Sequence, residues 1–89
     1  MLDRIVARAS KIAARVIDGE AVVISLGEGQ VHFLNATGTF LWESVDGTHK
    51  VRDLVIALQE RFDVSDEDAT TDVMEFVIEL EKQGIIELR

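Results

Sequence analysis

Two glycine-containing turns bracket a short β-branched stretch, and this arrangement most constrains the fold. Asp18-Gly19 precedes the stretch EAVVISL at 20–26, and Gly27-Glu28-Gly29 follows it. Asp-Gly is a strong signal for a two-residue hairpin turn, which needs a strand on each side. The sequence therefore predicts three antiparallel strands, at about 11–17, 20–26 and 30–34.

The segment before the first turn has two interpretations. One is a helix, whose apolar stripe would contain Ile5, Val6, Ala9, Ile12, Ala13 and Val16. The other is a strand at 11–17, which alternates acceptably and which the hairpin at Asp18-Gly19 requires. We expect the strand, preceded at 1–9 by a poorly ordered or variable arm.

Three helical segments follow the strands. They are predicted at about 36–45, 49–62 and 66–83. Asn35 or Thr37 can cap the first, because either side chain accepts hydrogen bonds from the free N–H groups of a first turn. Thr48 is expected to cap the second helix. Ser65, followed by acidic residues, should cap the third, and Gly84 should end it.

The chain then closes with a short extended segment at 85–88. The expected fold is α+β, with a three-stranded antiparallel sheet followed by a three-helix, winged helix-turn-helix-like bundle. With 89 residues and no linker or repeat, the chain is expected to form a single domain over 1–89.

The sequence offers no recognisable catalytic centre. It has no cysteine, which excludes thiolate zinc sites and cysteine nucleophiles. His32 and His49 have no carboxylate at ligand spacing, and Gly27-x-Gly29 lacks the third glycine of a phosphate-binding loop. We expect no catalytic residue, no metal and no cofactor, and therefore a protein that is not an enzyme.

Charge is distributed unevenly along the chain. The net charge is −8, and fourteen acidic residues against five basic ones lie from Gly27 onward. The third helix is the one a winged helix-turn-helix protein inserts into DNA. Here it carries seven acids against Lys82 alone. Because phosphate contacts supply most of the affinity for DNA, this helix argues against a nucleic-acid partner.

No membrane partner is expected either. No apolar run approaches the roughly 20 residues that span a bilayer. The absence of cysteine is compatible with the cytoplasm, which is the expected location.

A binding surface is the remaining interpretation. The stripe of the third helix that the core needs consists of Ala69, Val73, Phe76, Val77 and Leu80. Met74 and Ile78 form a narrow apolar stripe on the same helix, too far round to share the core. A neighbouring strand could cover them, or they could line a groove for a partner. The third strand is expected at the edge of the sheet, where unpaired backbone groups permit a peptide to add as a further strand.

Most of the sequence resembles the PqqD family, small peptide-binding domains also called RiPP recognition elements. The resemblance covers about 11–88 and includes the stretch VHFLNATGTFLWESVDGTHKVRDLVIALQERFDV. The matching positions are Leu34-Asn35, Trp42, Asp46-Gly47-Thr48, Val51, Leu54, Leu58, Phe62-Asp63-Val64, Asp72-Val73, Phe76, Leu80 and Gly84-Ile85.

The resemblance implies a function as a peptide chaperone. Members bind the leader region of a ribosomally made precursor peptide and present it to a modifying enzyme, often a radical SAM protein. The leader adds as a strand beside the third strand and lies against the third helix. The implied peptide-binding residues are Gln30, Val31, His32, Phe33, Leu34, Met74, Glu75, Ile78 and Glu79.

Several alternatives stay open. The chain has no proline, unlike the Pro-containing entry of members that serve pyrroloquinoline quinone synthesis. A lasso-peptide protease or a sactipeptide-type maturase is therefore an equally open partner. The rival functions are a winged-helix nucleic-acid-binding regulator and a regulatory subunit that docks an enzyme through Met74 and Ile78. The edge strand also permits a homodimer.

Overall fold

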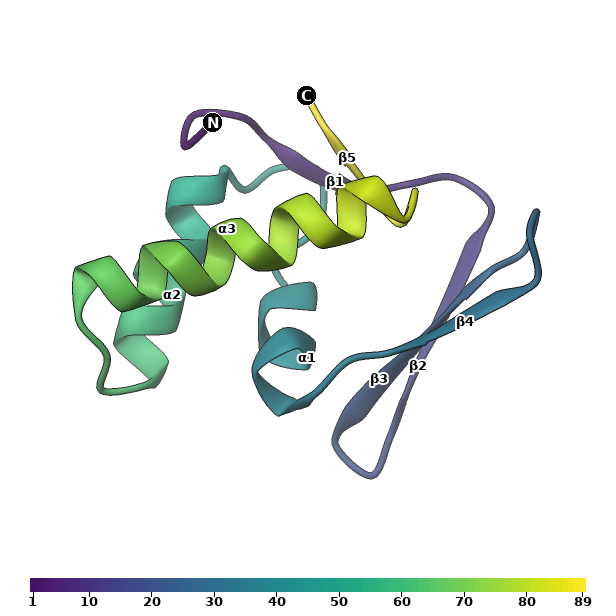
Figure 1. Ribbon diagram of the computed structural model, residues 1–89, viewed down its shortest axis with the longest axis horizontal. Coiled ribbons are helices and arrows are strands. Elements are labelled where there is room, and N and C mark those ends of the chain that lie inside the picture. The colour runs from purple at the N-terminus through teal and green to yellow at the C-terminus, as the bar shows by residue number, and fades with distance from the viewer.

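The computed structural model describes residues 1–89 and combines two small sheets with three helices (Figure 1). The elements in chain order are β1 Val6–Arg8, β2 Ile12–Ile17, β3 Glu20–Ser25, β4 Gln30–Phe33, α1 Ala36–Trp42, α2 Val51–Arg61, α3 Asp66–Lys82 and β5 Ile86–Leu88. One sheet has the order β2-β3-β4, and the other pairs β1 with β5. The predicted α+β class with a three-stranded antiparallel sheet is confirmed, and the winged helix-turn-helix-like detail stays a prediction. No helix is both long and apolar enough to cross a membrane.

The hairpin of β2 and β3 turns where the sequence predicts it. Asp18 and Gly19 both have positive φ, 52° and 81°, as a tight two-residue turn with the twist of the flanking strands requires. β4 pairs with β3 on its other side, with Val22 opposite Phe33. Both outer strands of this sheet are edges, and neither contributes a fully buried residue.

The N-terminal segment is ordered, so the expectation of a variable arm is wrong. β1 pairs antiparallel with β5, and Val6 has no exposed surface. The Arg4 guanidinium donates to the backbone oxygens of Leu88 and Arg89. Sequence patterns miss this strand because its hydrogen-bonding partner lies about eighty positions further along the chain.

The first helix is shorter than predicted, and the second begins later. α1 ends at Trp42 because Ser44 N–H and Val45 N–H bond to carbonyls three residues back, which tightens the last turn. Thr48 does not cap α2, because its hydroxyl donates to the Asp46 carboxylate instead. Lys50 takes the cap position, and its backbone N–H donates to the carboxylate of the residue three positions on.

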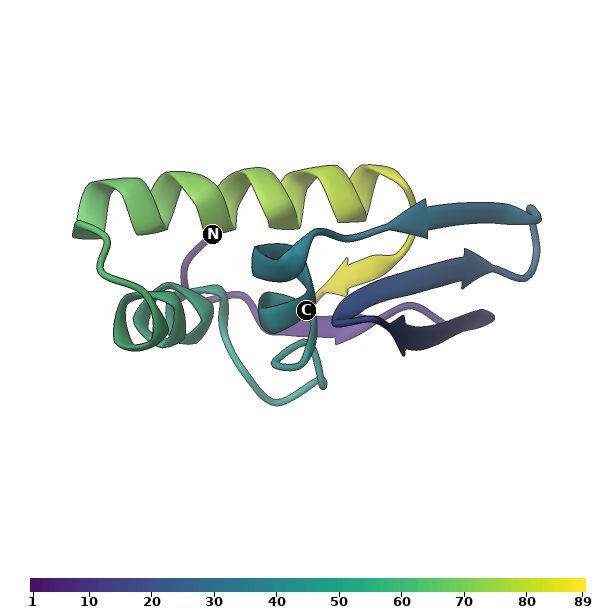
Figure 2. The same ribbon diagram turned by 90° about the horizontal axis from the view of Figure 1, so that it is seen from below.

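The third helix has the predicted ends. Ser65 Oγ accepts a hydrogen bond from Asp68 N–H, and Gly84 follows the helix with a φ of 75°. α3 lies along one side of the molecule, with α1 and α2 on its inner side and the β2-β3-β4 sheet extending beyond α1 (Figure 2). Apolar side chains of α3 belong to the same buried cluster as those of α1, α2, β3 and β5. The largest fully buried side chains are Leu41, Leu54, Leu58, Ile85, Val6, Val23, Val45, Val51, Val73 and Val77.

Candidate binding groove

A groove of about 740 Å³ lies between the end of β4, the start of α1 and the C-terminal half of α3. Its floor is apolar and consists of Leu34, Leu41, Phe76 and Leu80. Its rim on α3 carries carboxylates from Asp72, Glu75 and Glu79. No lysine, arginine or histidine is among the residues that line it.

The turn from strand to helix shapes one end of this groove. Asn35 Oδ1 accepts from Gly38 N–H at 2.8 Å and so starts α1 directly after the strand. Gly38 is buried, and a Cβ there would lie 3.3 Å from Asn35 Oδ1 and 3.7 Å from Phe76 Cε1. The tight contact is the one to Asn35, so the glycine leaves room for the capping side chain, whereas Phe76 of α3 lies at an ordinary contact distance.

One long edge of the groove is the unpaired side of β4. Leu34 N–H donates to the Ala21 carbonyl at 2.9 Å, so the backbone groups of Leu34 point toward β3. Hydrogen-bonded and non-bonded pairs alternate along antiparallel strands. Given the register of β3 and β4, the N–H and C=O groups of Val31 and Phe33 therefore point to the free edge. The site thus offers four backbone hydrogen-bonding groups to an added strand.

The side chains of β4 divide between two faces. Val31 and Phe33 lie on the outer face and are 49% and 77% exposed. His32 is opposite Val23, a core residue, and therefore faces inward with Leu34. The Nε2 atom of His32 is buried and has no hydrogen-bond partner. An added strand would extend both faces, and its own inward side chains would enter the groove.

The α3 carboxylates at the rim have no cationic partner. The three ion pairs of the molecule are His49–Asp46, Arg52–Asp3 and Arg89–Glu87, all outside the groove. Glu79 makes one neutral contact, in which its Oε1 accepts from Gln83 Nε2 at 2.9 Å. The rim is therefore a surface of uncompensated negative charge above an apolar floor.

The structure brings five of the nine predicted peptide-binding residues into the groove lining: Phe33, Leu34, Glu75, Ile78 and Glu79. Gln30, Val31 and His32 lie outside the lining, on the adjoining strand. Sequence reasoning missed the remaining lining residues, which are Asn35, Thr37, Gly38, Leu41, Asp72, Phe76 and Leu80. Phe76 and Leu80 fall on the apolar stripe of α3 that the sequence assigns to the core. They pack with the core and also line the groove.

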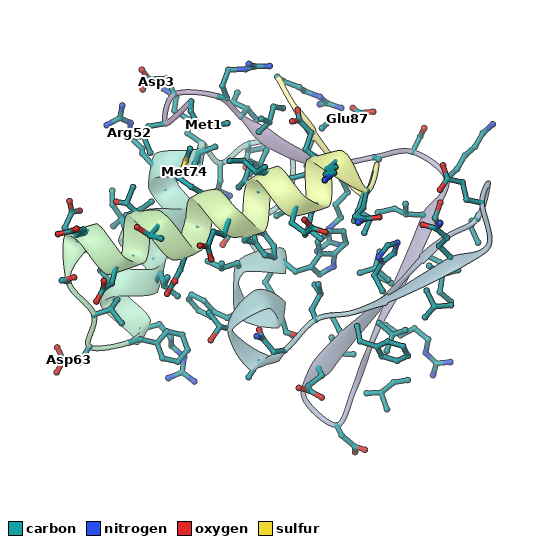
Figure 3. The ribbon with its side chains drawn as sticks, viewed as in Figure 1. Met1, Asp3, Arg52, Asp63, Met74 and Glu87 are labelled. Atoms are coloured by element: carbon teal, nitrogen blue, oxygen red, sulfur yellow. The ribbon has the colours of Figure 1, made fainter.

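Met74 is placed elsewhere. It is half-buried and packs against the hydrophobic core, outside the groove lining. In Figure 3 it lies on the same side of α3 as Met1 and Arg52. At about 100° per residue, Met74 is roughly 200° around the helix from Asp72, which the rim includes. The expectation that Met74 is too far round to share the core is wrong, and the Met74–Ile78 docking alternative loses one of its two residues.

The structure contains no group of three or more side chains that could hold a metal ion. What the groove and the free strand edge can do is bind an extended chain, through backbone hydrogen bonds on one side and side-chain contacts on the other.

Two solved structures have closely similar folds. One is TbiB1 in complex with the TbiA(beta) leader peptide, with a TM-score of 0.85, 21% identity, and coverage of 91% of this chain and 94% of that one. The other is lasso peptide synthetase B1 complexed with the leader peptide, with a TM-score of 0.83, 21% identity, and coverage of 92% and 96%. At this identity the two likenesses establish the fold.

The sequence comparisons establish the family. The comparison with curated protein sequences gives no match. The family model described as coenzyme PQQ synthesis protein D (PqqD) matches residues 20–86, which span the sheet from β3 onward, all three helices and the start of β5. The chain therefore belongs to the PqqD family.

Proposed function

We propose that this protein binds the leader region of a ribosomally synthesised precursor peptide and delivers it to a modifying enzyme. The observation that carries the proposal is the free backbone edge of Val31 and Phe33 beside the groove. Membership of the PqqD family supports it, as do the leader peptides in the two similar structures.

The leader adds as a fourth strand next to β4. Backbone hydrogen bonds to Val31 and Phe33 supply affinity with little dependence on sequence, since every residue except proline offers the same groups. Inward side chains of the leader meet Leu34 and Phe76, which supply selection by shape and apolar contact. The protein makes and breaks no covalent bond in this role, so it acts as a chaperone rather than as an enzyme.

The enzyme that receives the leader is a radical SAM protein or another RiPP maturase. We place the function in the cytoplasm, where ribosomal precursors are made. A homodimer through β4 would compete with the leader, because it would occupy the same N–H and C=O groups.

A selection with random linear peptides tests the function without a known precursor. Displayed peptides of about twelve residues, long enough to span β4 and the groove at about 3.3 Å per residue, are enriched on the immobilised protein. Enriched peptides are synthesised and titrated into the ¹⁵N-labelled protein. We expect micromolar dissociation constants, shifts of the Val31 and Phe33 amides, and slower hydrogen exchange at both.

Two results would contradict the proposal. One is the recovery of no binding peptide at all. The other is peptides that bind while the amides of Val31 and Phe33 keep their shifts and exchange rates.

A further inference from the structure

The groove has a chemical bias that the proposed function does not require. Its floor is apolar, and its rim presents the carboxylates of Asp72, Glu75 and Glu79 without any cationic neighbour among the lining residues. Like charges gathered along one wall repel each other and attract a cationic side chain. A bound peptide that brings a positive charge to this wall would compensate it.

Strand geometry determines which peptide side chains can reach the wall. Peptide residues opposite Val31 and Phe33 share their outer face, whereas residues opposite His32 and Leu34 point inward. These two inward positions are i and i+2, about 6.7 Å apart. The inward side chains of an added strand therefore enter the groove in pairs, two positions apart.

The wall has a matching repeat. β4 runs in the direction opposite to α3 and lies beyond the C-terminal end of the helix (Figures 1 and 2), and the groove lining continues from the end of β4 onto α3. Glu75 and Glu79 are one helical turn apart, which is about 6 Å along the axis, and Phe76 lies between them in the sequence. One inward side chain can thus lie on the apolar floor at Phe76 while its i+2 neighbour reaches a carboxylate.

Resting on the proposed function, we infer that the groove selects a leader segment with a bulky apolar residue and a lysine or arginine two positions apart. The apolar side chain contacts Leu41 and Phe76, and the cationic head lies among Asp72, Glu75 and Glu79. The long stem of lysine or arginine suits this position, because its methylene groups can cross the apolar floor while the charge stays at the rim.

The experiment compares peptide selection on the wild-type protein and on a charge-neutral groove. The groove variant combines Asp72→Asn, Glu75→Gln and Glu79→Gln. These amides keep the shape of the side chains, and the amide introduced by Glu79→Gln retains an oxygen that can accept from Gln83. The matched control combines Glu60→Gln, Glu67→Gln and Glu81→Gln, which remove the same charge from exposed positions outside the lining.

On the wild type and the control, we expect enriched peptides to carry an apolar residue and a lysine or arginine at i and i+2. On the groove variant, the apolar preference should remain and the basic preference should disappear. Replacing the lysine of an enriched peptide with norleucine should weaken binding to the wild type by about three- to tenfold, and by less at high salt. The same replacement should leave binding to the groove variant nearly unchanged.

The outcomes separate this inference from the proposed function. Peptides that shift the Val31 and Phe33 amides but show no basic preference would overturn the inference and leave the function standing. The same holds if the basic residue is enriched at another spacing, or if the groove variant keeps the basic preference. A selection that yields no peptide at this edge would overturn the function itself.

Discussion

The Thr39 hydroxyl accepts a hydrogen bond from the backbone N–H of Ala21 at 2.7 Å, and both residues are buried. The carbonyl of Ala21 accepts from Leu34 N–H. One residue of β3 therefore holds both the start of α1 and the end of β4. These are two of the three segments that form the groove, so this contact fixes the free edge relative to the helices.

Replacing Thr39 with valine tests the contact. Valine keeps the size of the side chain but leaves the buried N–H of Ala21 without a partner, which costs about 1–3 kcal/mol of unfolding free energy. Chemical denaturation measures the loss. Thr39→Ser retains the hydroxyl and should lose clearly less, so equal stability of the valine and serine variants would rule out the hydrogen bond as the cause.

Ile78 and Met74 form a matched pair on α3. Ile78 is 50% exposed and lines the groove, whereas Met74 packs against the core. Ile78→Ala should change stability by at most about 0.5 kcal/mol and weaken peptide binding several-fold. Met74→Ala should cost about 1–2 kcal/mol of stability and leave peptide affinity unchanged.

Thermal unfolding and peptide titration on both variants provide the check. If Met74→Ala reduced affinity as much as Ile78→Ala does, the peptide-binding surface would have to extend past Ile78 to Met74, which lies outside the groove lining.

Local signals predict the fold where the deciding contacts are themselves local. Asp18-Gly19 needs only its own backbone preference to form the hairpin, and Ser65 needs only the first turn of α3. Thr48 carries the same capping chemistry, but the Asp46 carboxylate binds its hydroxyl, and no propensity scale anticipates that competition.

Contacts between distant segments explain what the sequence could not reveal. β1 is a strand only because β5 lies beside it, so residues 1–9 resemble a variable arm when the sequence is considered alone. The groove shows the same limit. The helical repeat places Ile78 and Glu79 near the groove, but it does not tell that the core covers part of Met74, one turn away.

The loop between α1 and α2 predicts a pH dependence. His49 Nδ1 lies 2.9 Å from both carboxylate oxygens of Asp46. The hydrogen bond to Asp46 raises the pKa of His49 above its usual 6.5. Hydrogen bonds from the Thr48 hydroxyl and then from His49 hold the pKa of Asp46 well below its usual range.

The two shifts act at opposite ends of the pH range. The contribution of His49 to the stability of the folded protein is fully present below about pH 6.5, and it is lost as the pH rises through the raised pKa of His49. The contribution of Asp46 is present above about pH 4 and is lost as the pH falls toward its lowered pKa. Stability from this pair should therefore be greatest between about pH 4 and 6.5.

Asp46→Asn isolates the charge, because asparagine can still accept from Thr48 N–H. An NMR titration should show the pKa of His49 falling toward its usual value in this variant. The small loss of stability that the wild type shows as the pH rises above about 6.5 should diminish in parallel. An unchanged His49 titration would show that Asp46 is not the cause of the shift.

A proline at Val31 tests strand addition directly. The N–H of Val31 points to the free edge, so proline removes a donor that the β3–β4 pairing does not use. Gln30 is already extended, as a residue before proline must be. We therefore expect Val31→Pro to fold with nearly unchanged stability and to bind selected peptides at least about tenfold more weakly, because one backbone bond is lost and the ring obstructs the edge.

Two further variants define what that result means. Val31→Thr keeps the N–H and the branched shape and should bind like the wild type. His32→Pro removes an N–H that points to β3, and it should destabilise the sheet itself. If Val31→Pro bound peptide as tightly as Val31→Thr, the leader could not be pairing with this edge, and the groove alone would have to account for binding.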